Sequence, residues 1–500
     1  MHMLAGVNLA ALMASPGIKP IAQWDASTST LAQLLALASH SRPSLAMMFD
    51  STGKLTYAPN NLLTQSNNFA SVSWTKDTAT ITSGVSDPLG GTNAFTVTAN
   101  AANAQVYQGV PFTGEGSVNF IQAIWVKRRT GSGTVSIYTP NGITKTSIAV
   151  NGSWQLFYTA GAGNAANIVY NTVFLDVSGD EVDIYFATLS AVTYETSPRT
   201  VDQVITTSAA YYGPRIDYDP NTLAVKGLLI EEARTNLALQ SNDLTTVSWP
   251  TDGVSKSTDG TLGPDGKSLM VKTLANAGGG FHVIYQSFAV TSGVSYASSI
   301  FVKKGNYRYV AISFEVSSGS NGFLAVFDLD NPSAATQSFS TGASSLTTYG
   351  IINCGGGIYR IYVAGTAGAS GTGYLLAHIV SGATIPTGSV EPTNFVAAGT
   401  EYAYFFGSQL EVGSFPTSYI PTAASSVTRA ADALSAASLT TNPAIIQYRD
   451  LATGTRARKV INPWSGISSE TNEWIEDIRI YPLGTSPTWL NAHLTVDGAW

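Results

Sequence analysis

The carboxyl groups of this chain are the first place to look for chemistry. Asp180, Glu181 and Asp183 fall in one acidic turn, where hard oxygen ligands could converge on a calcium ion. The alternative interpretation is a solvated acidic turn without a ligand. Cleavage of a glycosidic bond needs two carboxyls that face each other across a sugar, about 5 to 9.5 Å apart. Glu231 and Glu232 are adjacent, so on a strand they point to opposite faces and cannot do this.

The sequence also lacks the motifs of several other enzyme classes. The chain contains no G-x-S-x-G elbow and no H-E-x-x-H pair, and its five histidines are dispersed without metal-ligand spacing. The stretch GTLGPDGKS at 260–268 resembles a phosphate-binding loop, but it has one residue too many before its Gly-Lys-Ser end. The single cysteine, Cys354, excludes an intramolecular disulfide and a cysteine-based zinc site. We therefore assign no catalytic residue and expect a protein that is not an enzyme.

Binding of a saccharide needs fewer groups than its cleavage. A flat aromatic ring packs on the C–H face of a sugar, and a few amides or hydroxyls bind its hydroxyl groups. Three places offer such rings: the joint between the two halves of the chain, a strand start that carries an arginine, and a Pro-Trp turn. Each of these residues could equally belong to the core or to an interface. The glycan-binding candidates are Tyr211, Tyr212, Tyr307, Arg308, Tyr309 and Trp464.

One sequence phrase occurs twice in the chain, which indicates an internal duplication. The later match of Tyr107-Gln108 with Tyr285-Gln286 is shifted by a few positions, as loop insertions would shift it. The second copy also gains residues between its middle strands. Because Trp74 and Trp249 recur at strand-like positions, we expect both to be core residues. The matches at one constant offset are Asn61-Leu62 with Asn236-Leu237, Gln65-Ser66-Asn67 with Gln240-Ser241-Asn242, and Val72-Ser73-Trp74 with Val247-Ser248-Trp249.

Both copies consist of short β-rich runs, punctuated by Gly, Asn and Pro, which is typical of an antiparallel β-sandwich or jelly roll. One helix is expected where leucines fall near helical spacing behind a Ser/Thr-rich start, at 26–41. This helix could pack on the fold or anchor the chain to a larger particle. We predict a mainly β protein with two tandem sandwich domains, divided into an N-terminal anchor segment (1–58), module 1 (59–196), a joint (197–234), module 2 (235–432) and a separate C-terminal element (433–500).

Composition excludes several classes of partner. The chain has 500 residues with 44% hydrophobic content, enough for about three domains that each bury a core. Only 11% of the residues are charged and the formal net charge is −7, which argues against a nucleic-acid partner because phosphates attract a basic face. No apolar run approaches the roughly 18 residues that span a bilayer, so we expect no membrane insertion.

Several stretches between Arg215 and Asp432 resemble a module of tailed-bacteriophage structural proteins. That module occurs in head spike fibres and tail fibres and is similar to jelly-roll carbohydrate-binding domains. Module 1 shares with the phage module only the opening phrase NNLLTQSNNF at 60–69, the turn at Pro88–Gly90 and the strand pattern. The stretches that carry the resemblance are PRIDYDPNTLAVKGLLIEEARTNLALQSN at 214–242, PDG at 264–266, FVKKG at 301–305, GSQLEVGSFPTSYIPT at 407–422 and VTRAAD at 427–432.

The resemblance implies a virion protein that is made in the host cytoplasm and displayed on the particle surface. It further implies a homotrimer that contacts other virion proteins through its N-terminal segment and binds host cell-surface polysaccharide. The resemblance does not indicate whether the protein is attached to the phage head or to the tail. Two alternatives stay open at this point: a tailspike that degrades polysaccharide, and a capsid-decorating protein without a ligand.

Overall fold

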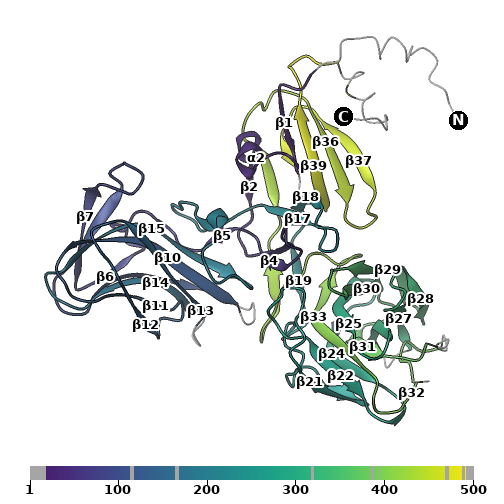
Figure 1. Cartoon of the computed structure of the whole chain (residues 1–500). Coiled ribbons are helices and arrows are strands. Elements are labelled where there is room, and N and C mark those ends of the chain that lie inside the picture. The colour runs from purple at the N-terminus through teal and green to yellow at the C-terminus, as the bar shows by residue number, and fades with distance from the viewer. Residues whose placement is uncertain are drawn as a thin grey trace.

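The computed structural model describes residues 19–112, 118–163, 168–316, 320–382, 385, 388–393, 395–467, 472–486 and 490. Almost every element in these ranges is a strand of an antiparallel sheet, so the predicted mainly β fold is confirmed. Figure 1 shows three lobes: module 1 in blue, module 2 in green, and a third lobe that combines the purple start of the chain with its yellow end. Residues 1–18 of the expected anchor and 491–500 of the C-terminal element lie outside the described residues.

Module 1 is a sandwich of two five-stranded sheets around one core. Side chains alternate between the core and the outer face, so Val169 and Val173 are buried while Tyr170 between them is half-buried on the outer face. The first sheet has the order β6 (Thr75–Asp77), β9 (Ala104–Pro111), β14 (Ile168–Leu175), β11 (Val135–Tyr138) and β12 (Lys145–Ile148). The second has the order β7 (Ala79–Val85), β8 (Ala94–Ala99), β15 (Glu181–Val192), β10 (Asn119–Thr130) and β13 (Gln155–Ala162).

Module 2 repeats this strand order and adds β28 and β29 between its middle strands, where the sequence predicts an insertion. The duplication is therefore visible in the topology. Its first sheet has the order β20 (Thr251–Asp252), β24 (Val283–Val290), β31 (Gly371–Ile379), β26 (Tyr309–Val316), β27 (Asn321–Asp328) and β28 (Ala335–Thr341). Its second sheet has the order β21 (Val254–Ser257), β22 (Val271–Ala275), β33 (Tyr402–Val412), β25 (Ser295–Lys304), β30 (Ile358–Thr366) and β29 (Ser345–Asn353).

The repeated sequence phrase has the same structural task in both modules. The side-chain oxygen of Asn61 accepts a hydrogen bond from the backbone N–H of Leu189 at 3.2 Å, and that of Asn236 accepts one from Leu410 at 3.0 Å. Both amides are buried, so each satisfies backbone groups that no strand partner reaches. The amide NH₂ groups donate to the carbonyls of Ala187 and Val204 in module 1 and of Ser408 and Ile420 in module 2.

The two recurring tryptophans are core residues, as predicted. Trp74 is 2% exposed and Trp249 is 1% exposed. The indole N–H of Trp74 donates to the carbonyl of Gln65 at 3.0 Å, and that of Trp249 donates to the carbonyl of Leu239 at 2.9 Å. The buried asparagines and tryptophans of the repeated phrase therefore serve the fold.

A hairpin separates the two modules and covers one outer face of module 2. It consists of β3 (Met47–Phe49) and β4 (Leu55–Tyr57), which pair antiparallel. Met47, Leu55 and Tyr57 share a buried cluster with Phe301 and Phe406 from the second sheet of module 2. Short elements complete the chain: the strand pairs β5 (Asn60–Asn61) with β16 (Tyr211–Tyr212), β19 (Arg234–Asn236) with β34 (Val427–Arg429), and, within module 2, β23 (Gly278–Gly279) with β32 (Val396–Ala397), together with the 3-10 turn η1 (Thr200–Asp202).

The third lobe is assembled from three distant parts of the chain. The sequence analysis treats 1–58, 197–234 and 433–500 as an anchor, a joint and a separate element, but strands of all three pair in one sheet. Apolar side chains from all three segments are buried in one shared core, for example Trp24, Leu228 and Ile446. The main sheet has the order β17 (Arg215–Tyr218), β18 (Val225–Ile230), β39 (Glu473–Ile480), β36 (Ala444–Asp450) and β37 (Arg456–Ile461), with β1 (Ala22–Asp25) also paired to β39. The second has the order β2 (Ala38–Ser41), β35 (Ala433–Ala436) and β38 (Gly466–Ile467).

The predicted helix is confirmed as α2 (Leu31–Leu37). Thr30 caps its start by accepting from the backbone N–H of Gln33, and the Gln33 side chain accepts from the backbone N–H of Thr30 in return. Leu34 and Leu37 are buried in the core of the third lobe, so the helix packs on the fold. None of the helices in the described ranges is long and apolar enough to cross a membrane.

Candidate functional site

The acidic turn of module 1 is neutralised by basic side chains and is not arranged for a metal. Asp180 accepts from Arg128 at 2.9 Å, and Asp183 accepts from Arg129 at 2.7 Å. Both aspartates are buried, so the alternative of a solvated turn is also wrong for them. Glu181 instead accepts from a threonine hydroxyl at 2.9 Å. Across the described part of the chain, no three metal-binding side chains gather, so the structure does not bring these three carboxyls together as calcium ligands.

Trp464 cannot serve as a platform for a sugar. It is 1% exposed and belongs to the core of the third lobe. Its indole N–H donates to the carbonyl of Leu37 at 3.2 Å, at the end of α2. The Pro-Trp turn looks exposed in the sequence, but α2 covers it, and the sequence gives no sign of that distant contact.

The second group of candidates lies together at the start of β26, where it holds a neighbouring loop. The Tyr307 ring stacks on Phe395 with centroids 5.1 Å apart, and its hydroxyl donates to the carbonyl of Val380 at 3.0 Å. The Arg308 guanidinium lies 4.8 Å from the Tyr309 ring centroid and forms an ion pair with an aspartate. One face of the Tyr307 ring and one face of the Tyr309 ring are therefore covered by other side chains of the protein.

Tyr212 lines a groove between module 1 and the strand β34, which we call the Tyr212 groove. It has a cavity volume of about 400 Å³ and contains the rings of Tyr212 and Phe112 with the hydroxyls of Ser44, Ser426 and Thr428. None of its lining side chains is charged. Its neighbour Tyr211 is half-buried and pairs through its backbone with Asn61, outside the lining.

A second groove lies on the outer face of the first sheet of module 2, and we call it the Tyr285–Tyr374 groove. Its two rings come from the adjacent strands β24 and β31, with centroids 5.9 Å apart and planes at 72°. Both tyrosines are half-buried. The groove has a cavity volume of about 220 Å³ and is lined by Asp252, Phe281, Val283, Tyr285, Glu315, Tyr374, Leu376 and Glu391.

The fold explains why this groove stays open. The hairpin β3–β4 covers the other sheet of module 2, so the first sheet presents the free outer face. On the β26 and β27 half of that face, Leu324 and Val326 are buried beneath Val380, Ile385 and Val390. On the β24 and β31 half, Tyr285 and Tyr374 line the groove.

Module 1 carries the same pair of tyrosines in the same register. Tyr107 pairs with Thr172 across β9 and β14, two residues beyond Tyr170, as Tyr285 pairs with Leu376, two residues beyond Tyr374. The Tyr107 and Tyr170 rings have centroids 6.2 Å apart with planes at 62°. The duplication therefore preserved an outward-facing aromatic pair as well as the core.

The Tyr285–Tyr374 groove differs from its counterpart by a buried carboxyl. Glu315 stands opposite Tyr374 in the β26–β31 register and is 3% exposed. Burial and then the charge and hydrogen bond of Glu391 raise the pKa of Glu315 to about 8, so the pair keeps a proton at neutral pH. The Glu315 Oε2 atom has no hydrogen-bond partner among the described residues.

These residues escaped the sequence analysis for a physical reason. The match of Tyr107-Gln108 with Tyr285-Gln286 indicates the duplication but does not by itself show which way the tyrosines point. Gln108 and Gln286 face the interior, where each side-chain oxygen accepts from a backbone N–H, at 2.8 Å and 2.6 Å. The period-two alternation of a strand then places both tyrosines outward. The recurrence of a tyrosine next to an inward-facing glutamine in both copies is therefore the sequence signal for an outward-facing aromatic residue.

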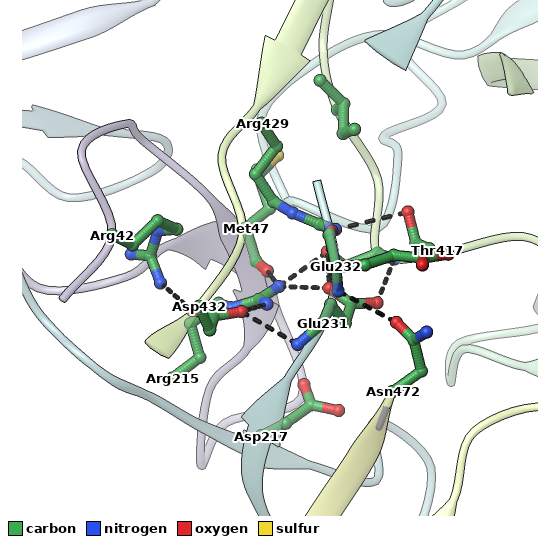
Figure 2. A network of polar contacts seen from close by, with 12 residues as sticks. Arg42, Met47, Arg215, Asp217, Glu231, Glu232, Thr417, Arg429, Asp432 and Asn472 are labelled. Carbon is green, nitrogen blue, oxygen red and sulfur yellow. Dashed lines mark hydrogen bonds and ion pairs between the residues drawn. The ribbon is translucent and has the colours of Figure 1, made fainter. Parts of the chain in front are cut away.

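A network of buried ions joins the third lobe to module 2, as Figure 2 shows. Arg215 on β17 donates to Glu231 at 2.6 Å and also pairs with Asp432. Arg429 on β34 donates to the same Glu231 oxygen at 2.5 Å, and Arg42 donates to Asp432 at 2.7 Å. All five side chains are at most 1% exposed. The PRIDY, IEEAR and VTRAAD stretches of the resemblance therefore meet at one structural junction.

The acid stability of this junction follows from its carboxyl groups. Burial alone would raise the pKa of Glu231, but the charges of Arg429 and Arg215 outweigh burial and lower it to about 2. A lowered carboxyl pKa stabilises the folded state above the unfolded pKa and loses that effect as the pH falls through the folded pKa. We expect the thermal unfolding midpoint, followed by circular dichroism, to fall between about pH 4.5 and pH 2. A Glu231→Gln variant should show a flatter profile, whereas identical profiles would contradict this assignment.

Comparisons with known proteins give no assignment. No protein-family model matches the chain, and no curated protein sequence matches it significantly. A tandem pair of CBM22 domains from Paenibacillus barcinonensis Xyn10C overlaps with 10% identity over 71% of this chain and 99% of that chain, at a TM-score of 0.25. The enzymatically active domain of tailspike protein 4 from bacteriophage CBA120 overlaps with 16% identity over 25% of this chain and 20% of that chain, at a TM-score of 0.20. Overlaps this weak carry no argument about function.

Proposed function

We propose that this protein is a bacteriophage virion protein, a head spike or tail fibre component, that binds host-surface saccharide in the Tyr285–Tyr374 groove. The phage part of the proposal is supported by the sequence resemblance between Arg215 and Asp432. The binding part is supported by the groove itself. The two parts are tested separately.

The observation that carries the binding proposal is the Glu315 Oε2 atom, which has no hydrogen-bond partner within the described ranges and belongs to a residue that lines a groove with two half-buried rings. A buried acceptor without a partner costs about 1–3 kcal/mol, and a sugar hydroxyl that donates to Oε2 would remove this cost. The Tyr285 and Tyr374 rings supply the apolar faces on which sugar C–H groups pack. A volume of about 220 Å³ lies below the roughly 300–1,000 Å³ of sites for drug-sized ligands, so it suits one sugar ring.

The same groove is better suited to binding than to cleavage. Glycosidases hold their two carboxyls about 5–9.5 Å apart, so that a sugar and a nucleophile or water fit between them. Glu315 and Glu391 instead share a hydrogen bond with each other. They therefore act as one unit, and we propose a protein that is not an enzyme. The alternative is a tailspike that degrades the polysaccharide it binds.

An array of bacterial capsular and lipopolysaccharide glycans tests the binding proposal, together with an assay for new reducing ends on every glycan that binds. We expect binding without release of oligosaccharide. Release would favour the degrading tailspike, and silence on the array would favour a capsid-decorating protein. Immunogold labelling of intact particles tests the phage part, because labelling of neither heads nor tails would contradict it.

A further inference from the structure

The charge of the Tyr285–Tyr374 groove is unusual for a site that binds a neutral sugar. Three of its lining residues carry carboxyls, namely Asp252, Glu315 and Glu391, and none is basic. Burial and the charge of Glu391 raise the pKa of Glu315 to about 8, so Glu315 holds its proton at neutral pH and the negative charge of the groove lies on the other two carboxyls. A neutral sugar could satisfy an acceptor here but would leave this charge uncompensated.

The aromatic lining of the groove fits a positive group. Phe281, Tyr285 and Tyr374 line the same cavity as the carboxyls. The faces of aromatic rings attract cations, and the attraction grows when the cation is desolvated. An ammonium group also brings three donors, one of which matches the unpartnered Oε2 of Glu315.

Module 1 shows that the carboxyl is not needed to hold the tyrosines in place. Its Tyr107 and Tyr170 rings keep nearly the same separation as the pair in module 2. Opposite Tyr170, where Glu315 stands in module 2, module 1 has Pro140, whose carbonyl accepts from the Tyr170 backbone N–H at 2.8 Å. The buried acid of module 2 is therefore an addition to a common aromatic platform.

Resting on the proposed function, we infer that the Tyr285–Tyr374 groove selects a saccharide that carries a protonated amino group. Its ammonium lies between the rings and the Glu315–Glu391 pair, and Asp252 at the rim adds a second negative charge. The sugar ring packs on the tyrosines. An N-acetylated sugar of the same backbone lacks the charge and binds more weakly.

Two probes of equal length test this inference: a fully deacetylated chitooligosaccharide, which carries free amino groups, and its N-acetylated counterpart. Isothermal titration at about pH 6 keeps an amino group with a pKa near 8 protonated. We expect the deacetylated probe to bind the full-length protein at least about tenfold more tightly, with the preference shrinking as salt is added.

Charge-removing variants assign the preference to this groove. Glu391→Gln should abolish most of the preference, because at about pH 6 Glu315 is protonated and Glu391 is the charged member of the pair. Asp252→Asn, on an exposed rim residue, should reduce the preference even if Glu391→Gln fails to fold. Asp330→Asn removes a surface carboxyl of module 2 that pairs with Lys304 outside the groove, and it should change nothing. A preference that persists in both groove variants would overturn the inference.

The outcomes also separate this inference from the proposed function. Equal or tighter binding of the N-acetylated probe would overturn selection for an amino group and leave saccharide binding standing. Binding of neither probe would overturn the inference as well, and the glycan array would then decide on saccharide binding by itself.

Discussion

Replacing Arg215 with alanine should lower the free energy of unfolding by about 3–5 kcal/mol, the usual cost of removing one partner from a buried ion pair. Arg215 is completely buried and pairs with both Glu231 and Asp432. In the variant, Arg429 still pairs with Glu231 and Arg42 still pairs with Asp432. The two buried carboxylates nevertheless lose Arg215, the cation that pairs with both. Chemical denaturation should show the loss as an earlier first transition, because module 1 does not contain this network.

The control is Lys304→Ala, which breaks a lysine–aspartate pair at the surface of module 2. The Lys304 side chain is 40% exposed and that of its partner Asp330 is 36% exposed, and surface pairs contribute about 0–1 kcal/mol. The two variants each remove one cation, from opposite environments. A change at Arg215 no larger than the change at Lys304 would contradict the assignment of the junction as the structural link between the third lobe and module 2.

Removing either ring of the groove should weaken saccharide binding at least about tenfold, and removing both should abolish measurable binding. An aromatic side chain contributes about 1.5–3 kcal/mol when it is buried, and 1.4 kcal/mol corresponds to a factor of ten in affinity. The variants are Tyr285→Ala, Tyr374→Ala and the double variant, titrated with a glycan that binds on the array. Both rings are half-buried on an outer face, so their loss should leave the core of module 2 intact.

Tyr107→Ala in module 1 is the control for this prediction. Tyr107 is half-buried and pairs with Tyr170 as Tyr285 pairs with Tyr374. Module 1 has Pro140 at the position that Glu315 occupies in module 2. The affinity of Tyr107→Ala should stay within about twofold of the original protein. Loss of binding in Tyr107→Ala with retention in Tyr374→Ala would move the site to module 1.

The sequence predicts the two sandwiches because their signals are local. Strand alternation, turn residues and the repeated phrase around Asn61 and Asn236 all act within a few residues. The helix at Leu31–Leu37 is predicted for the same reason. The third lobe was not predicted because its strands come from both ends of the chain, with Ala22 beside Ile480. No local pattern encodes such a pairing.

The candidate site was only partly predictable. Of the aromatic residues predicted from turn-like stretches, Tyr212 lines a groove, whereas Trp464 is buried against the end of α2. Alternation shows that Tyr285 and Tyr374 leave the core, but it does not show which outer face a hairpin covers. The position of Glu315 beside Tyr285 and Tyr374 depends on three strands meeting in register, which no local sequence pattern encodes.

A crystal structure of the protein with an array-positive saccharide tests the central claim most directly. The account predicts one sugar ring packed on Tyr285 and Tyr374, with a donor of the sugar within about 2.7–3.2 Å of the Glu315 Oε2 atom. A saccharide bound instead in the Tyr212 groove or on module 1, with the Tyr285–Tyr374 groove empty, would contradict it.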